Sequence, residues 1–168
     1  MNLAEELMKS RSKEQRDAIV HYVGQGPTLF AELLDIMYHG QKPKLREYAA
    51  WPVGHIGYNH PHLALPHCAS LIEVLNKKVH PALHRASLRI LQKVDIPEDL
   101  QGNAFDICFK MLCDLKYPIA SRVFSMSVLH NIAKGEPELM EELKSVIRDL
   151  YDHGSAGFKA RARRIING

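Results

Sequence analysis

The sequence predicts an all-α fold made of repeated helical hairpins, and three observations lead to this prediction. Apolar residues recur at spacings of three and four along nearly the whole chain, which is the period of an α-helix. No segment shows sustained alternation of apolar and polar residues, the pattern of a half-buried strand. Prolines recur along the chain. Proline is favourable in the first turn of a helix, because the backbone N–H that it lacks would make no hydrogen bond within the helix at that position.

Two segments show the helical period most clearly. Each carries a continuous stripe of apolar residues that would lie on one side of a helix. The stripes are Leu65, Cys68, Ile72, Leu75 and Val79 in one segment and Ile119, Val123, Met126, Leu129 and Ala133 in the other.

Two interleaved series of residues give the period of the repeat. One set of helices begins at intervals of 34, 36 and 40 residues, at Pro27, Pro61, Pro97 and Pro137. A second set begins between them, and its helices carry, at intervals of 39, 37 and 39 residues, Arg46, Arg85, Arg122 and Arg161. A period near 40 with two helices in each unit is typical of helical solenoids.

The chain is long enough for one domain, which we expect to cover residues 1–168. Ser12 followed by Gln15 is a capping-box pattern and predicts a helix that runs to about Val23. Residues 1–24 would then cap the stack, because a terminal repeat otherwise leaves its apolar stripe in water. The four units are predicted at about 25–57, 58–95, 96–134 and 135–168.

The chain resembles the HEAT repeats of the armadillo-like class over about residues 25–168. Residues 65–75 are similar to a first HEAT helix and residues 81–94 (PALHRASLRILQKV) to a second. In the fourth unit, residues 136–150 and 155–166 (SAGFKARARRII) are similar to the same pair. The resemblance implies an α-α superhelix of about four HEAT-like hairpins with an N-terminal capping helix.

Composition narrows the class of protein. Apolar residues make up 46% and charged residues 24% of the chain, as in ordinary globular proteins. The start of the chain is acidic, no apolar run reaches about 18 residues, and the cysteine count is odd at three. We therefore expect a cytoplasmic protein with reduced thiols that does not enter a membrane.

The segment from Trp51 to His67 departs most from the regular pattern. Pro52 falls inside a predicted helix, so we expect a kink or an early helix end there. Local rules are most often broken at functional sites, which makes this segment a candidate binding surface. Alternatively, Gly54 and Gly57 let a neighbouring helix approach closely and Trp51 fills the core. The candidate binding residues of the segment are Trp51, His55, His60 and His62.

The histidines of this segment invite a metal hypothesis, because imidazole is a common zinc ligand. Their spacing does not favour it: His60 and His62 straddle Pro61 in a predicted loop, and no carboxylate or cysteine lies at a standard ligand spacing. We expect no metal site and no cofactor.

A second candidate surface is a row of arginines on the second helices. In HEAT-like stacks these helices line the concave face, so the row would suit carboxylate or phosphate groups of a partner. Alternatively, each arginine pairs with an acid at the preceding helix end, for which Asp35, Asp114 and Asp152 are candidates. The row consists of Arg46, Arg85, Arg89, Arg122 and Arg161.

Three functions remain open at this point. The first is a non-catalytic module that serves as a protein-interaction scaffold, by analogy with solenoids. The second is nucleic-acid binding, because DNA-alkylation-repeat proteins are HEAT-like stacks with a cationic concave face; a net charge of only +3 disfavours it. The third is an enzyme of unknown reaction, although the chain contains none of the usual nucleotide-binding, nucleophile-elbow or Cys-x-x-Cys motifs.

Overall fold

The structure is a computed structural model that describes all 168 residues, and every regular element in it is helical. This confirms the predicted all-α fold of helical hairpins. The elements are α1 (Leu3–Lys9), α2 (Lys13–Val23), α3 (Pro27–His39), α4 (Pro43–Asn59), α5 (Pro61–Ala64), the 3-10 turn η1 (Leu65–His67), α6 (Cys68–Glu73), the 3-10 turn η2 (Val74–Asn76), α7 (Pro81–Leu91), α8 (Glu98–Cys113), α9 (Ile119–Ala133), α10 (Pro137–Tyr151) and α11 (Ala156–Asn167).

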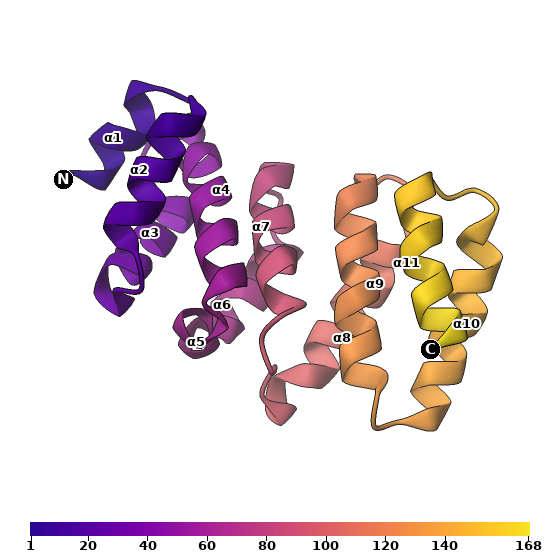
Figure 1. Cartoon of the computed structure of the whole chain (residues 1–168). Helices are drawn as coiled ribbons and strands as arrows, with labels where there is room; N and C mark the ends of the chain where they lie inside the picture. Colours follow the sequence, from indigo (N-terminus) through magenta and orange to yellow (C-terminus); the bar gives the residue numbers. More distant parts are fainter. The chain divides into compact units, whose positions relative to one another are not determined.

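The chain forms two compact units, and the first comprises residues Met1–Asp95. Helix α3 packs on α4, while α6 and η2 pack on α7. Helices α2, α4 and α7 lie side by side, because α4 contacts α2 on one side and α7 on the other (Figure 1). The side chains of Leu33, Met37, Leu71 and Leu88 are fully buried in this unit. Helix α4 is therefore the central element of the unit.

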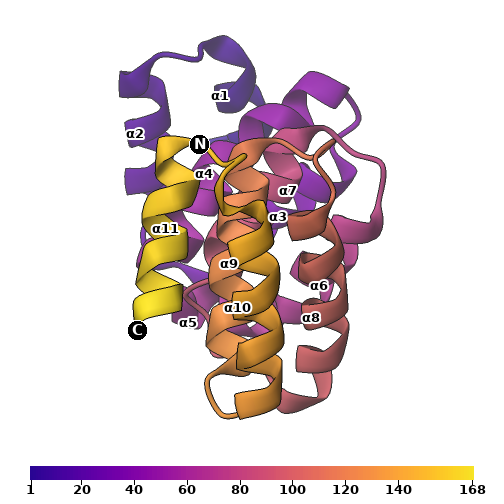
Figure 2. The same cartoon turned by 90° about the vertical axis from the view of Figure 1, so that its right-hand side faces the viewer.

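The second unit comprises residues Ile96–Gly168 and contains two helical hairpins. Helix α8 pairs with α9 and α10 pairs with α11, while α9 also contacts both helices of the last hairpin. Figure 2 shows these four helices running alongside one another. Met111, Leu129, Leu143 and Phe158 are fully buried between them.

Residues with a known preference for helix starts begin most helices. Proline occupies the first turn of α3, α4, α5, α7 and α10, where no N–H is required. The Ser12 hydroxyl accepts a hydrogen bond from the backbone N–H of Gln15 at 3.1 Å, and α2 ends at Val23, as predicted. Gly24 then adopts a φ of 51°, which glycine tolerates without steric cost.

Two local predictions need correction. Pro52 does not end its helix, since α4 continues to Asn59; Pro52 is buried, and packing of α4 against its neighbours, above all α3 and α7, holds the helix together. The first helix of the second predicted unit does begin at Pro61, but the stretch through residues 65–75 is broken into short pieces and is not one continuous helix. Pro66 lies in the 3-10 turn η1 and has no N–H for a continuous helical ladder.

The glycines of α4 let α7 approach closely, as one of the two interpretations of this segment anticipated. A Cβ atom on Gly57 would lie 2.6 Å from Cδ1 and 2.7 Å from Cγ1 of Ile90. A Cβ atom on Gly54 would lie 3.2 Å from the Cα atom of Ala86. A larger residue at Gly54 would press on the backbone of α7, and one at Gly57 would displace the buried side chain of Ile90.

Candidate functional site

Four aromatic side chains share one side of α4. At 100° per residue they fall within roughly 80° of one another around the helix. Each is half-buried, and the rings of Trp51 and His55 are stacked with their centroids 5.0 Å apart and an interplanar angle of 15°. The four residues are Tyr48, Trp51, His55 and Tyr58.

Cations from the neighbouring elements lie over these rings. The guanidinium of Arg16, on α2, lies 4.7 Å from the centroid of the Trp51 ring. Arg11 lies over Tyr48 at 4.6 Å, and Arg89 and Lys93 lie over Tyr58 at 5.0 and 4.8 Å. Such cation–π contacts hold both partners in place. We call this set of eight residues the α4 aromatic face.

The electrostatic environment of the face is cationic. The acid Glu47 already has partners: its carboxylate oxygens lie 3.6 Å from Nη2 of Arg11 and 3.9 Å from Nε2 of His80. Burial lowers the pKa of His55, and the positive charge of Arg89 lowers it further, while Asp17 acts in the opposite direction. His55 is therefore mostly neutral at pH 7 and contributes a flat ring rather than a charge.

Arg16 and Arg89 make no hydrogen bond or ion pair within the chain. The Nε atom of Arg16 is buried without a partner, so only its terminal N–H groups are available to a ligand. A guanidinium that stacks on a ring through its flat side keeps the donors at its edge. These two arginines can therefore donate to a carboxylate or a phosphate.

The structure brings together some of the predicted site residues and separates others. Trp51, His55 and Arg89 belong to the α4 aromatic face. Arg85 is exposed one turn before Arg89 on α7, on the same side of that helix. Arg46 lies roughly 200° around α4 from Tyr48, so it points away from the face. The binding role of these residues stays a prediction.

Arg122 and Arg161 lie in the second unit and contact their own chain. Arg122 is 6% exposed; its Nε–H donates to the carbonyl oxygen of Leu112 at 3.0 Å, and its guanidinium lies 5.2 Å from the Phe158 ring centroid. Arg161 donates from Nη1 to the hydroxyl of Ser127 on α9. Both arginines thus connect helices of this unit.

Two of the three acids proposed as partners of the arginine row, Asp114 and Asp35, have other contacts. The carboxylate of Asp114 accepts from the backbone N–H of Lys116 at 2.9 Å. The carboxylate of Asp35 lies 4.0 Å from Nε2 of His39. For Arg122, a backbone carbonyl and an aromatic ring take the role that the sequence assigned to an acid.

The remaining histidines of the irregular segment lie at the junction of α4 and α5. The rings of His60 and His62 meet edge to face at 6.0 Å. His62 lies in the first turn of α5 and not in a loop, which corrects the sequence prediction. His60 is close enough to His55 to lower the pKa of that residue slightly.

His67 provides a prediction about acid stability. Its ring meets Phe30 edge to face at 6.1 Å, and burial lowers the pKa of the imidazole. A lowered pKa means that His67 stabilises the fold above the pKa of the unfolded chain, about 6.5, and that this contribution is lost as the pH falls through the folded pKa. His67→Gln should therefore make the melting temperature less dependent on pH between neutral and mildly acidic buffers. Identical pH dependence of both proteins in thermal melts would contradict this expectation.

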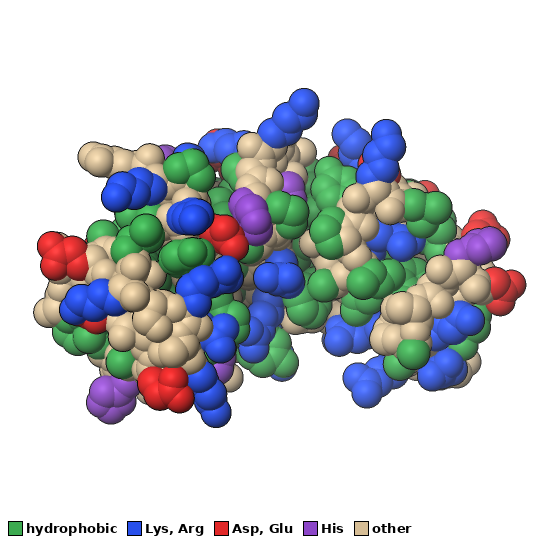
Figure 3. Space-filling model, turned by 90° about the horizontal axis from the view of Figure 1, so that it is seen from above, with side chains coloured by type: hydrophobic (Ala, Val, Ile, Leu, Met, Phe, Trp, Pro, Cys, Tyr) green, Lys and Arg blue, Asp and Glu red, His purple; other side chains and the backbone are tan.

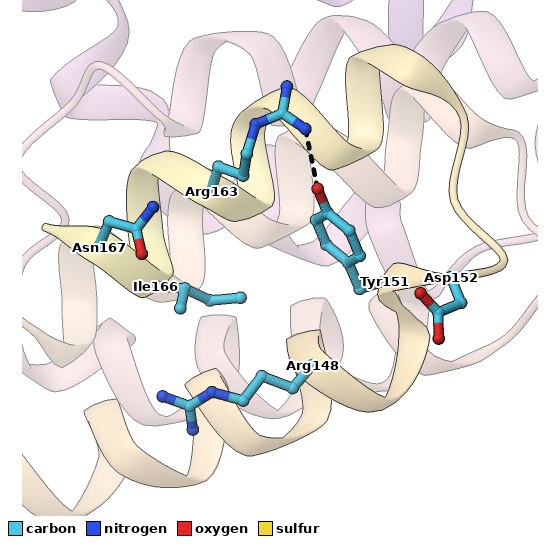
Figure 4. Close-up of a pocket in the computed structure, with 6 residues that line it drawn as sticks. All are labelled: Arg148, Tyr151, Asp152, Arg163, Ile166 and Asn167. Carbon is cyan, nitrogen blue, oxygen red and sulfur yellow. Dashed lines mark hydrogen bonds between the residues drawn. The ribbon is translucent and has the colours of Figure 1, made fainter.

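A pocket of about 290 Å³ lies between α10 and α11 in the second unit. Figure 4 shows Arg163 and Asn167 from α11 facing Tyr151 and Arg148 from α10. Arg163 donates to the Tyr151 hydroxyl at 2.8 Å, which uses one of its donors. Asp152 adds a carboxylate beside the two arginines, so the pocket has mixed charge. It contains none of the residues predicted as a site.

Three of the eight residues of the α4 aromatic face are among the sequence candidates; the other five are Tyr48, Tyr58, Arg11, Arg16 and Lys93. Tyr48 and Tyr58 were visible as members of a stripe with Trp51 and His55, at helical spacings of three, four and three. Arg11 and Arg16 belong to residues 1–24, for which the sequence predicts only the role of capping the helical stack. Their contact with α4 depends on how the chain folds back, which no local pattern encodes.

Comparison with known proteins bears on the whole chain. The model of the HEAT repeat domain family matches residues 3–168. No curated protein and no solved structure gives a significant match. None of the helices combines the length and the apolar character that crossing a membrane requires.

Figure 3 shows Lys and Arg side chains set among hydrophobic ones on the visible side of the Met1–Asp95 unit, on the left of the view.

Proposed function

Because the chain belongs to the HEAT repeat domain family, whose repeats commonly mediate protein interactions, we propose that it is a non-catalytic module that binds another protein through the α4 aromatic face. The observation that carries this proposal is the composition of the face. Tryptophan, tyrosine and arginine are the residues most enriched among those that dominate binding energy at protein interfaces. Here they lie together on one helix and its two neighbours.

The rigidity of the face supports the same function. Helix α4 is packed between α2 and α7, and its rings are held by cations from both. Side chains that are already ordered lose little conformational entropy when a partner binds. Rings that are half-buried also keep part of their surface available for contact.

Nucleic-acid binding is the second candidate, and the cations of the face are the observation that favours it. The ring faces that would stack on bases already contact cations or His55, and the net charge is only +3. Protein binding therefore remains the preferred function.

Photo-crosslinking in native cells tests the proposal. Asn59 is exposed on α4 at the edge of the face, and Ser145 is exposed on α10 and serves as the control position. With benzoylphenylalanine in place of Asn59 we expect discrete protein adducts, and with the same group in place of Ser145 we expect few. The adducts should disappear when Arg16→Gln and Arg89→Gln are added. Equal adducts from both positions, or adducts only with nucleic acid, would contradict the function.

A further inference from the structure

We infer that the partner segment bound by the α4 aromatic face is acidic, and that its carboxylates are held by Arg16 and Arg89. This inference rests on the proposed function, since it names the chemistry of the protein partner. Charge complementarity, unused hydrogen-bond donors and the spacing of the two arginines carry it.

The charges of the face leave it positive. Four cations, Arg11, Arg16, Arg89 and Lys93, lie over its rings. Two carboxylates oppose them: Glu47, which already contacts Arg11 and His80, and Asp17 near His55. His55 is mostly neutral and does not alter this balance at pH 7. A negatively charged segment would therefore be attracted to the face, and a positively charged one repelled.

The two central arginines have the geometry that a carboxylate needs. Each guanidinium lies over a ring, Arg16 4.7 Å from the centroid of Trp51 and Arg89 5.0 Å from that of Tyr58, with no intramolecular acceptor. The planar fork of donors can then bind a carboxylate through two parallel hydrogen bonds. Because stacking already restricts the guanidinium, little further ordering is required when the carboxylate arrives.

The spacing of the arginines sets the spacing of the acids. Trp51 and Tyr58 are seven residues apart, so their Cα atoms are separated by roughly 10 Å along α4. The arginines above them should be separated by a similar distance. Three residues of a chain in the polyproline II conformation rise about 9 Å and return to the same side, because this helix has three residues per turn. The partner segment should therefore carry two acidic residues about three positions apart.

Nucleic acid fits the same face less well. Binding of single strands depends on open aromatic rings on which bases stack. In this face the Trp51 ring contacts both a guanidinium and an imidazole, and the Tyr58 ring contacts two cations. Carboxylates approach the guanidinium edges and do not require the ring faces.

The single tryptophan makes the inference testable with the full chain. Trp51 is the only tryptophan, so its fluorescence reports on the α4 aromatic face alone. The probe is a fluorescein-labelled peptide of repeating Glu-Gly-Ser, and the control peptide has Gln in place of Glu. We expect the Glu peptide to change the Trp51 emission and to raise the anisotropy of its label, and the Gln peptide to do neither. The affinity should fall with added salt.

Variants then assign the contacts. Arg16→Gln and Arg89→Gln should each weaken binding of the Glu peptide about tenfold, as the loss of a charge-assisted pair predicts. Arg148→Gln, at an exposed position of α10, is the matched control and should change the affinity by less than about twofold. Melting temperatures of all three variants check that they fold.

The outcomes separate this inference from the proposed function. If the Glu and Gln peptides bind alike, or if the Glu peptide leaves Trp51 unchanged while the Asn59 photo-crosslinks still form, the acidic partner is wrong and the protein-binding function stands. If oligothymidylate binds more tightly than the Glu peptide and competes with it, both are wrong and nucleic acid is the ligand.

Discussion

Replacement of Gly57 by valine is expected to lower the free energy of unfolding of the first unit by about 2–3 kcal/mol. The first added carbon alone would lie 2.6 Å from Cδ1 of Ile90, well inside van der Waals contact. Ile90 is fully buried, so its side chain would have to move against packed neighbours or α4 and α7 would have to separate, and buried contacts would be lost either way. Urea unfolding followed by Trp51 fluorescence measures the effect, because Trp51 lies on the same helix.

Two further variants show whether the clash is the cause. Gly102→Val, in α8, is the matched control, since nothing lies within 4 Å of a Cβ atom there, and it should change stability by no more than about 0.5 kcal/mol. Ile90→Ala removes the atoms that the introduced valine side chain would meet. The double variant should therefore be more stable than the sum of the two single changes predicts. Strict additivity would mean that Gly57 is not needed for the approach of α7.

Replacement of Arg122 by alanine should destabilise the second unit by about 3 kcal/mol, through loss of a charge-assisted hydrogen bond and creation of a cavity. Arg122 is 6% exposed and joins three helices: it starts from α9, donates to Leu112 of α8 and covers Phe158 of α11. Removal would leave the Leu112 carbonyl without this donor. Thermal unfolding followed by circular dichroism measures the change.

The controls for Arg122 separate a structural role from a binding role. Arg164→Ala, at an exposed position of α11, should alter stability by no more than about 0.5 kcal/mol. Arg122→Lys keeps the charge but loses the planar fork, so it should lie between wild type and alanine. A variant Arg122→Ala that melts like the wild type would contradict the structural role.

The row of arginines illustrates how far a repeat in the sequence can be interpreted. One arginine recurs near the start of each successive second helix, and the regular spacing suggested one shared role for Arg46, Arg85, Arg122 and Arg161. Their surroundings differ: Arg122 is buried with its guanidinium over the Phe158 ring, Arg161 contacts Ser127, and Arg46 lies beside the loop at Gly40. Periodicity indicates which face of a helix a residue occupies, but the neighbouring helix decides what that residue contacts.

The prolines between Trp51 and His67 also show that neighbouring helices decide the outcome of a local sequence pattern. Pro52 suggested a broken helix, yet α4 continues past it because neighbouring helices pack against it. Pro66 does interrupt the stretch that begins at Pro61, which consists of the short helices α5 and α6 joined by a 3-10 turn. The cost of a proline in a helix is a local property, whereas the contacts that offset this cost are tertiary.

The amino-acid sequence by itself determined the all-α class, the hairpin period, the start of α2 at Ser12 and the candidates Trp51, His55 and Arg89. These follow from helical periodicity, capping and proline chemistry, which act over a few residues. Only the tertiary structure decided that Arg16 covers Trp51, that Ile90 fills the space beside Gly57 and that Arg122 is buried. Those contacts join residues on different helices, far apart along the chain, and their geometry depends on how whole helices pack.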